Sequence, residues 1–177
     1  IAEVPALVAP AASITYGELA GEVRALAVAL RSRGIGPDTI VALTARSEVD
    51  HLLAALALLE LGAPQVALAS HDPPAMRLRL ARRVGATLVL ADRPDDAVAG
   101  LDRIDLGAAL ASARANPRGD AEPGFDAAIP ALYLTGSGTP AQPKAPRLSH
   151  HHPAPRAAPH IPSPAQPHPP PPPPPPP

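Results

Sequence analysis

Residues 132–150, LYLTGSGTPAQPKAPRLSH, combine the residue types that binding of a polyphosphate requires. Glycines let backbone amides converge on phosphate oxygens, hydroxyl side chains add donors, and a lysine supplies a mobile positive charge. The same mixture of Gly, Ser and Pro is also typical of an ordinary surface loop, so composition alone leaves both interpretations open. The residues that would bind phosphate are Thr135, Gly136, Ser137, Gly138, Thr139 and Lys144.

Two well-defined nucleotide motifs do not fit this stretch. GSGTPA matches the dinucleotide fingerprint G-x-G-x-x-A, but that motif must open a helix whose N-terminus meets the pyrophosphate. Here Pro143 and Pro146 follow at once, and no acidic residue follows a further strand about 20 positions later. The Walker pattern fails as well, because Lys144 is neither preceded by glycine nor followed by Ser or Thr.

Other titratable residues carry weaker signals. His51 lies near a predicted helix start and His71 just after a predicted strand, and we expect both to face solvent rather than to take part in catalysis. The histidine run at 150–152 can bind nickel or zinc loosely, but a defined metal site needs ligands that further contacts hold in place. The sequence therefore predicts no catalytic residue and no metal site.

The candidate loop needs a framework that presents it, and the sequence predicts an α/β one. Apolar segments without clear alternation suit the strands of a parallel sheet that is covered on both faces. Helical segments separate them, so we expect a mostly parallel sheet flanked by helices. The last strand leads directly into the glycines, and such folds bind ligands at the carboxyl ends of their strands. The predicted strands are 39–45, 64–69, 86–92 and 129–135.

End signals mark the helices. Thr15 and Glu18 have the spacing of a capping box and open the first helix, which Gly34 can end in a left-handed conformation. Ser47 and Asp72 are the predicted N-caps of the next two helices. The remaining signals are the stops Gly62 and Gly85 and a short helix near 105–115.

The end of the chain differs from the rest in composition. Residues 151–177 are rich in His, Pro and Ala and finish in an unbroken run of prolines from Pro169. Because proline lacks the amide donor, such a run adopts polyproline II or stays disordered. We therefore expect a folded part at 1–150 and a low-complexity tail at 151–177. Two origins of the tail stay open: a natural linker or partner-binding segment, and out-of-frame translation of a GC-rich gene.

Composition excludes several classes of protein. The net charge is −1 with no basic patch, which argues against a nucleic-acid partner. The absence of cysteine excludes disulfides and thiolate metal sites and fits a cytoplasmic protein. No apolar stretch reaches the roughly 18 residues of a membrane span, and no signal peptide is visible.

Residues 5–150 resemble the adenylate-forming, or AMP-binding, superfamily of acyl-CoA synthetases and peptide-synthetase adenylation domains. The loop is similar to that family's phosphate-binding loop, a hydroxyl- and glycine-rich run followed by Gly-x-Pro-Lys-Gly. SITYGEL resembles the family's Leu-Thr-Tyr-x-Glu-Leu segment, and ALRSRGIGPDTIVAL and LALLELGAPQVALASHDPPAMRLRLARRVGATLVLAD resemble the segments that follow it. The pieces occur in the family's order and spacing, so the chain resembles an N-terminal fragment of such an enzyme, with its partial AMP-binding subdomain at 1–150.

The resemblance implies a ligase that uses ATP and Mg²⁺. A small carboxylic acid would attack the α-phosphate, pyrophosphate would leave, and the acyl-adenylate would pass to CoA or to the thiol of a carrier protein. By position, Ser137, Gly138 and Thr139 would contact the β- and γ-phosphates, Thr135 and Gly136 would shape the loop, and Lys144 would neutralise the leaving group. The identity of the acid and of the acceptor stays open.

Departures from the family pattern lead us to expect weak phosphate binding. Pro140 replaces a hydroxyl residue, Ala141 replaces glycine, and Pro146 is expected to interrupt the next strand. The family's later segments and catalytic lysine are absent, so the isolated chain is expected to be inactive. One alternative is a non-catalytic α/β domain with a proline-rich arm that binds a partner. Another is that the chain does not fold alone, because its sheet would expose unpaired edges.

Overall fold

The computed structural model describes residues 1–9, 12–117, 130–133 and 147–149. The predicted phosphate loop at 135–144, the tail at 151–177 and the boundary between the two predicted parts lie outside these ranges and stay predictions. The helices are α1 (Tyr16–Arg31), α2 (Glu48–Glu60), α3 (Pro74–Val84), η1 (Pro94–Asp96) and α4 (Leu106–Ala115). The strands are β1 (Pro5–Ala9), β2 (Ala12–Thr15), β3 (Val41–Thr44), β4 (Gln65–Ala67), β5 (Leu88–Ala91), β6 (Asp102–Asp105), β7 (Pro130–Tyr133) and β8 (Arg147–Ser149).

A mixed sheet organises the molecule. In the described part of the chain it has six strands in the order β6-β5-β3-β4-β7-β8, of which the first five are parallel and β8 is antiparallel to β7. This confirms the α/β fold and the four predicted strands, which are β3, β4, β5 and β7. The strand that Pro146 was expected to interrupt does form: it is β8, which begins at the next residue.

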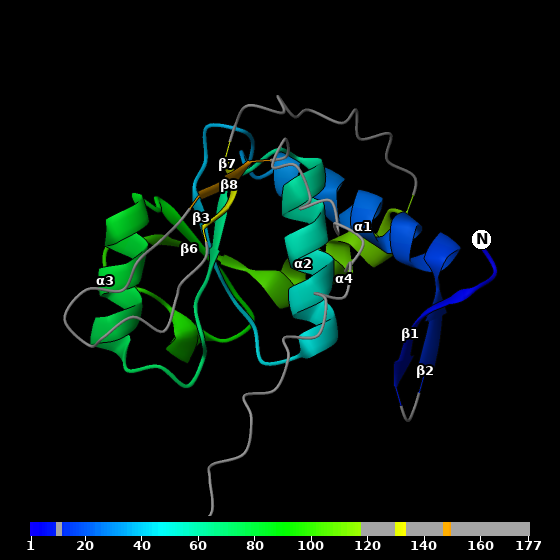
Figure 1. The fold of residues 1–177 in the computed structure, drawn as a ribbon, viewed down its shortest axis with the longest axis horizontal. Helices are drawn as coiled ribbons and strands as arrows, with labels where there is room; N and C mark the ends of the chain where they lie inside the picture. Colours follow the sequence, from blue (N-terminus) through cyan, green and yellow to red (C-terminus); the bar gives the residue numbers. More distant parts are fainter. Residues whose placement is uncertain (10–11, 118–129, 134–146, 150–177) are drawn as a thin grey trace, which may run out of the picture.

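Helices cover both faces of the sheet (Figure 1). On one face α1, α2 and α4 form a core with Val41 and Leu43 of β3, and on the other α3 packs against a second cluster that includes Ala42. Every residue of β3 is buried. Such two-sided burial explains why the strands read as apolar runs without alternation.

The first two helices begin where the sequence predicts. Thr15 and Glu18 form the complete capping box, in which the Glu18 carboxylate accepts from the Thr15 amide at 2.9 Å and the Thr15 hydroxyl accepts from the Glu18 amide at 3.2 Å. These bonds lower the pKa of Glu18, because they favour the ionised carboxylate. Ser47 caps α2 by accepting from the amide of Asp50.

The predicted cap Asp72 is wrong. Helix α3 begins at Pro74 after Pro73, and no side chain caps it. Proline suits the first helical position because its φ is fixed and its missing amide would have no intrahelical partner. The N-cap is therefore Pro73, one residue beyond Asp72, and the helix itself begins at Pro74.

The predicted glycine stops adopt the left-handed conformation. Gly62 and Gly85 have φ of 68° and 75°, and Gly85 is the C-cap of α3. Gly34 has φ of 84°, but α1 itself ends at Arg31, and the Ile35 amide donates back to the Leu30 carbonyl to close the turn. The chain thus leaves each helix in the direction that the next strand requires.

The structure also contains elements that the sequence did not predict. Strands β1 and β2 form a separate antiparallel hairpin that extends away from the body of the molecule (Figure 1). Strand β6 forms the outer edge of the main sheet beside β5. No helix in the described residues combines the length and apolar character needed to cross a membrane.

Candidate functional site at the carboxyl edge of the sheet

Strand β7 brings the chain to the carboxyl edge of the sheet. It is parallel to β4, with Leu132 beside Gln65 and Tyr133 beside Val66. The six residues predicted to bind phosphate follow two to eleven positions after Tyr133, in a stretch outside the described residues. The part of the prediction that the structure tests is therefore the strand that precedes them, and that strand lies within the sheet as expected.

Two cavities lie beside β4, and the first of them is at its carboxyl end. One, of about 360 Å³, is lined by Ala45 after β3, by His51 of α2 and by the segment that follows β4 as far as Asp72. The other, of about 340 Å³, lies between α2 and the strands β4 and β7 and has a largely apolar lining that includes Leu132. We call them the polar cavity and the apolar cavity. Both volumes lie in the range of small-molecule sites.

The polar cavity occupies a topological switch point. After β3 the chain enters α2 on one face of the sheet, and after the neighbouring β4 it enters α3 on the opposite face. Where adjacent loops separate in this way, a crevice opens outside the carboxyl ends of the strands, and open α/β sheets bind their ligands there. The topology alone therefore accounts for a hollow between β3 and β4.

His51 lies in the wall shared by the two cavities. Its side chain is half-buried in the first turn of α2, whereas His71 is exposed. Burial lowers the pKa of His51 below its ordinary value near 6.5, because it disfavours the charged imidazole. The solvent-facing position predicted for His71 is confirmed and that predicted for His51 is wrong. The apolar residues at helical spacing after it, Ala55 and Leu58, are the signal that would have placed it against the body of the protein.

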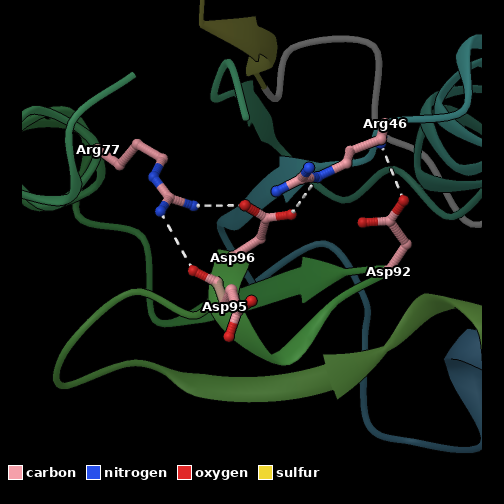
Figure 2. A network of polar contacts seen from close by, with 5 residues as sticks. All are labelled: Arg46, Arg77, Asp92, Asp95 and Asp96. Carbon is pink, nitrogen blue, oxygen red and sulfur yellow. Dashed lines mark hydrogen bonds and ion pairs between the residues drawn. The ribbon is translucent and has the colours of Figure 1, made fainter. Parts of the chain in front are cut away.

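A second group of polar side chains lies on the α3 side of the same edge (Figure 2). The buried carboxylate of Asp96 accepts from Arg77 Nη1 at 3.2 Å and from Arg46 Nε at 3.4 Å. Asp92 accepts from the Arg46 amide at 2.9 Å, and Arg77 also donates to the carbonyl of Asp95. The charges of this network balance within the protein, so we assign it a structural role in holding the ends of β3 and β5 against α3.

Metal-ligating side chains do not cluster in the described part of the chain. This part includes no group of three or more His, Cys, Asp or Glu residues arranged to hold a metal ion. Hydroxyl, imidazole and carboxylate groups do line the polar cavity, where Ser70 and Asp72 accompany the two histidines.

A mostly parallel sheet that helices cover on both faces, with a cavity at its switch point, defines an open α/β domain. Residues 2–159 match the model of the AMP-binding enzyme family, and the chain belongs to that family. It is 30% identical over 147 residues to a 4-chlorobenzoate–CoA ligase from an Arthrobacter species, an alignment that covers 77% of this chain and 28% of the relative. The resemblance seen in the sequence is thereby confirmed.

Solved structures agree with this assignment. The N-terminal subdomain of Klebsiella oxytoca NpsA, in complex with 3-hydroxyanthranilyl-AMSN, superposes with a TM-score of 0.72 at 27% identity over 82% of this chain and 36% of that one. The O-succinylbenzoate coenzyme A synthetase MenE of Bacillus subtilis, in complex with AMP, shares the fold with a TM-score of 0.70 at 19% identity, over 83% of this chain and 39% of that one. The chain therefore spans well under half the length of the relatives it matches.

Proposed function

We propose that this chain is the N-terminal part of an ATP-dependent ligase that activates a carboxylic acid as an acyl-adenylate. Family membership supports the adenylate-forming class. One observation links it to this chain's own residues: β7 lies parallel to β4, so the two strands end at the same edge of the sheet, where the polar cavity lies. The proposal assigns residues 1–150 to a partial AMP-binding subdomain and residues 151–177 to a separate low-complexity tail.

The proposed reaction has two steps. A carboxylate oxygen of the acid attacks the α-phosphorus of ATP, and the bond to the bridging oxygen of pyrophosphate breaks. A thiolate, of CoA or of a carrier protein, then attacks the acyl carbon and AMP leaves. Mg²⁺ bound with ATP would supply further charge neutralisation during the first step.

This chain's own contribution would be to hold the phosphates. The amides and hydroxyls of Ser137, Gly138 and Thr139 would bind the β- and γ-phosphates, and Thr135 and Gly136 would set the shape of the loop. The ammonium of Lys144 would stabilise the charge that develops on pyrophosphate. Positioning and charge stabilisation of this kind dominate catalysis of phosphoryl-type transfer.

Nuclear magnetic resonance of the isotopically labelled full chain tests the proposal. Titration with Mg·ATP should shift the amide signals of residues 135–144 and the Lys144 side chain. Lys144→Ala should weaken binding about tenfold, the effect of losing one hydrogen bond to a charged group. Arg83→Ala is the matched control, because Arg83 is an exposed cation in the last turn of α3 and binding should not change.

The alternative function gives a different pattern. A non-catalytic domain with a proline-rich arm would leave 135–144 unaffected by Mg·ATP and would respond to an added proline-binding module with shifts confined to 153–177. The many prolines after His152 are the observation that favours it. That result would replace the ligase with an interaction protein.

A further inference from the structure

The first sixteen residues form an apolar surface without charges. The exposed large apolar side chains in the described part of the chain all belong to this segment: they are Ile1, Val4, Val8 and Tyr16. No residue from 4 to 15 carries a charge. Charged side chains commonly protect exposed strands from association with another chain. The segment therefore lacks a device that would keep a second molecule away.

The hairpin of β1 and β2 has no core of its own. It extends away from the body of the molecule (Figure 1), and none of its described side chains is buried. An isolated two-stranded hairpin is at best marginally stable in water and becomes stable by packing against a further element. A surface that covers the hairpin would therefore stabilise it.

A groove continues this apolar surface along the first two helices. It has a volume of about 310 Å³ and begins at Tyr16, whose side chain is half exposed. Its floor is apolar and belongs to both helices, with Leu19, Ala20 and Val23 from α1 and Leu56 from α2. A contiguous apolar surface with a polar rim is typical of a protein–protein interface.

The rim of the groove carries one cation and one anion. Arg24 of α1 is exposed, Glu60 is the last residue of α2, and within the described residues neither side chain makes an ion pair or a hydrogen bond. The helix dipole disfavours an acidic residue at a helix C-terminus, and the last turn of α2 has no basic residue to compensate. A cation from another molecule would therefore stabilise Glu60, as an anion would stabilise Arg24.

A surface with these features is complementary to itself. We propose that the α1–α2 groove, together with the adjoining hairpin, is the interface through which two copies of this chain associate. In an isologous dimer every contact occurs twice, so Arg24 of each copy would meet Glu60 of the other. Tyr16 would lie in the apolar centre, where interfaces favour aromatic side chains. A different protein would have to supply both opposite charges, whereas a second copy supplies them by symmetry alone.

Sedimentation velocity of the full chain tests the proposal. A concentration series should run from the mass of a monomer to that of a dimer by about 100 μM. Tyr16→Asp should weaken association about tenfold, because it places a charge in the apolar centre. The variant should stay folded, because an acidic residue suits the first turn of a helix. Ala75→Asp is the matched control: Ala75 is exposed in the first turn of α3, and association should not change.

Exchange of the two charges distinguishes their pairing from a general loss of stability. Arg24→Glu alone and Glu60→Arg alone each place like charges opposite one another and should weaken association about tenfold. An equimolar mixture of the two variants should form a heterodimer more strongly than either variant associates with itself, because every opposed pair in it is attractive. A chain with both substitutions should associate like the parent.

Several results would overturn the proposal. They are a chain that remains a monomer at about 100 μM, equal effects of Tyr16→Asp and Ala75→Asp, and failure of the two charge variants to associate when mixed. Binding of an added amphipathic helical peptide along α1 and α2 by a chain that stays monomeric would assign the groove to a different protein. All the masses are measured without ATP, so the outcome does not depend on the proposed ligase activity.

Discussion

Asp96 is a charged residue that the fold encloses almost completely. Its side chain is 2% exposed and that of its partner Arg77 is 5% exposed, whereas the second partner, Arg46, is 49% exposed. Removing two charges from water is unfavourable unless each finds a partner inside the protein. The pair joins η1 to α3, so the stability of the loop after β5 depends on both residues being present.

Breaking the buried pair should be costly. Asp96→Ala leaves the Arg77 guanidinium buried without its carboxylate and should lower the free energy of unfolding by about 3–5 kcal/mol. Arg46→Ala removes a partner from the solvent side and should lower it by at most about 1 kcal/mol. Urea denaturation monitored by circular dichroism measures both. Equal effects of the two substitutions would contradict the structural role assigned to the network.

Sequence reasoning located the candidate chemistry only in part. The loop at 135–144 was identifiable because glycine, hydroxyl residues and lysine occur together in one stretch. The polar cavity was not, because His51 and Asp72 are distant in the sequence and become neighbours only when β3 and β4 pair. Residues assembled by strand pairing leave no local pattern to detect.

At the scale of elements, the sequence predicted the buried strands from their apolar residues and the starts of two helices from their capping residues. Strands β3, β4 and β5 are short apolar runs between helices with clear ends, and each was predictable from those features. Strand β6 is DRID, a polar edge strand with one exposed and three half-buried residues, and its composition resembles a loop. Strand β2 was not predicted, because its residues lead directly into the capping box of α1 and resemble part of the helix start.

The C-cap of α3 allows a test of whether a left-handed glycine stabilises the end of a helix. Gly85 has φ of 75°, where a side chain is strained whatever space surrounds it, and Gly36 has an ordinary φ with no atom within 4 Å of an added Cβ. Gly85→Ala should therefore lower the free energy of unfolding by about 1–2 kcal/mol. Gly36→Ala should not lower it. Thermal unfolding of the two variants beside the parent chain gives the comparison, and equal loss at both positions would mean that strain at the cap is not the cause.

At the scale of the whole molecule, the chain supplies a framework and a set of proposed ligand contacts. Its sheet is covered on both faces. The apolar cluster on one side includes Val41 and Leu43 of β3, and the cluster on the other side includes Ala42 of β3 and Val66 of β4. The relatives it matches are much longer, since this chain covers 28% of the Arthrobacter ligase and 36% of the NpsA subdomain. Binding and turnover are therefore separate questions for this polypeptide.

The isolated chain is expected to bind without turnover. Adenylation requires the carboxylate, the α-phosphate and the leaving group to be held in line while charge moves onto pyrophosphate, and small errors in that geometry cost large factors in rate. The proposed residues contact only the terminal phosphates, and Pro140 and Ala141 remove a hydroxyl and a glycine from the same loop. Incubation with Mg·ATP and a panel of aryl, fatty and amino acids should thus release no pyrophosphate above background. Full-length 4-chlorobenzoate–CoA ligase with its own acid serves as the positive control, and acid-dependent release by the present chain would show that these residues suffice for chemistry.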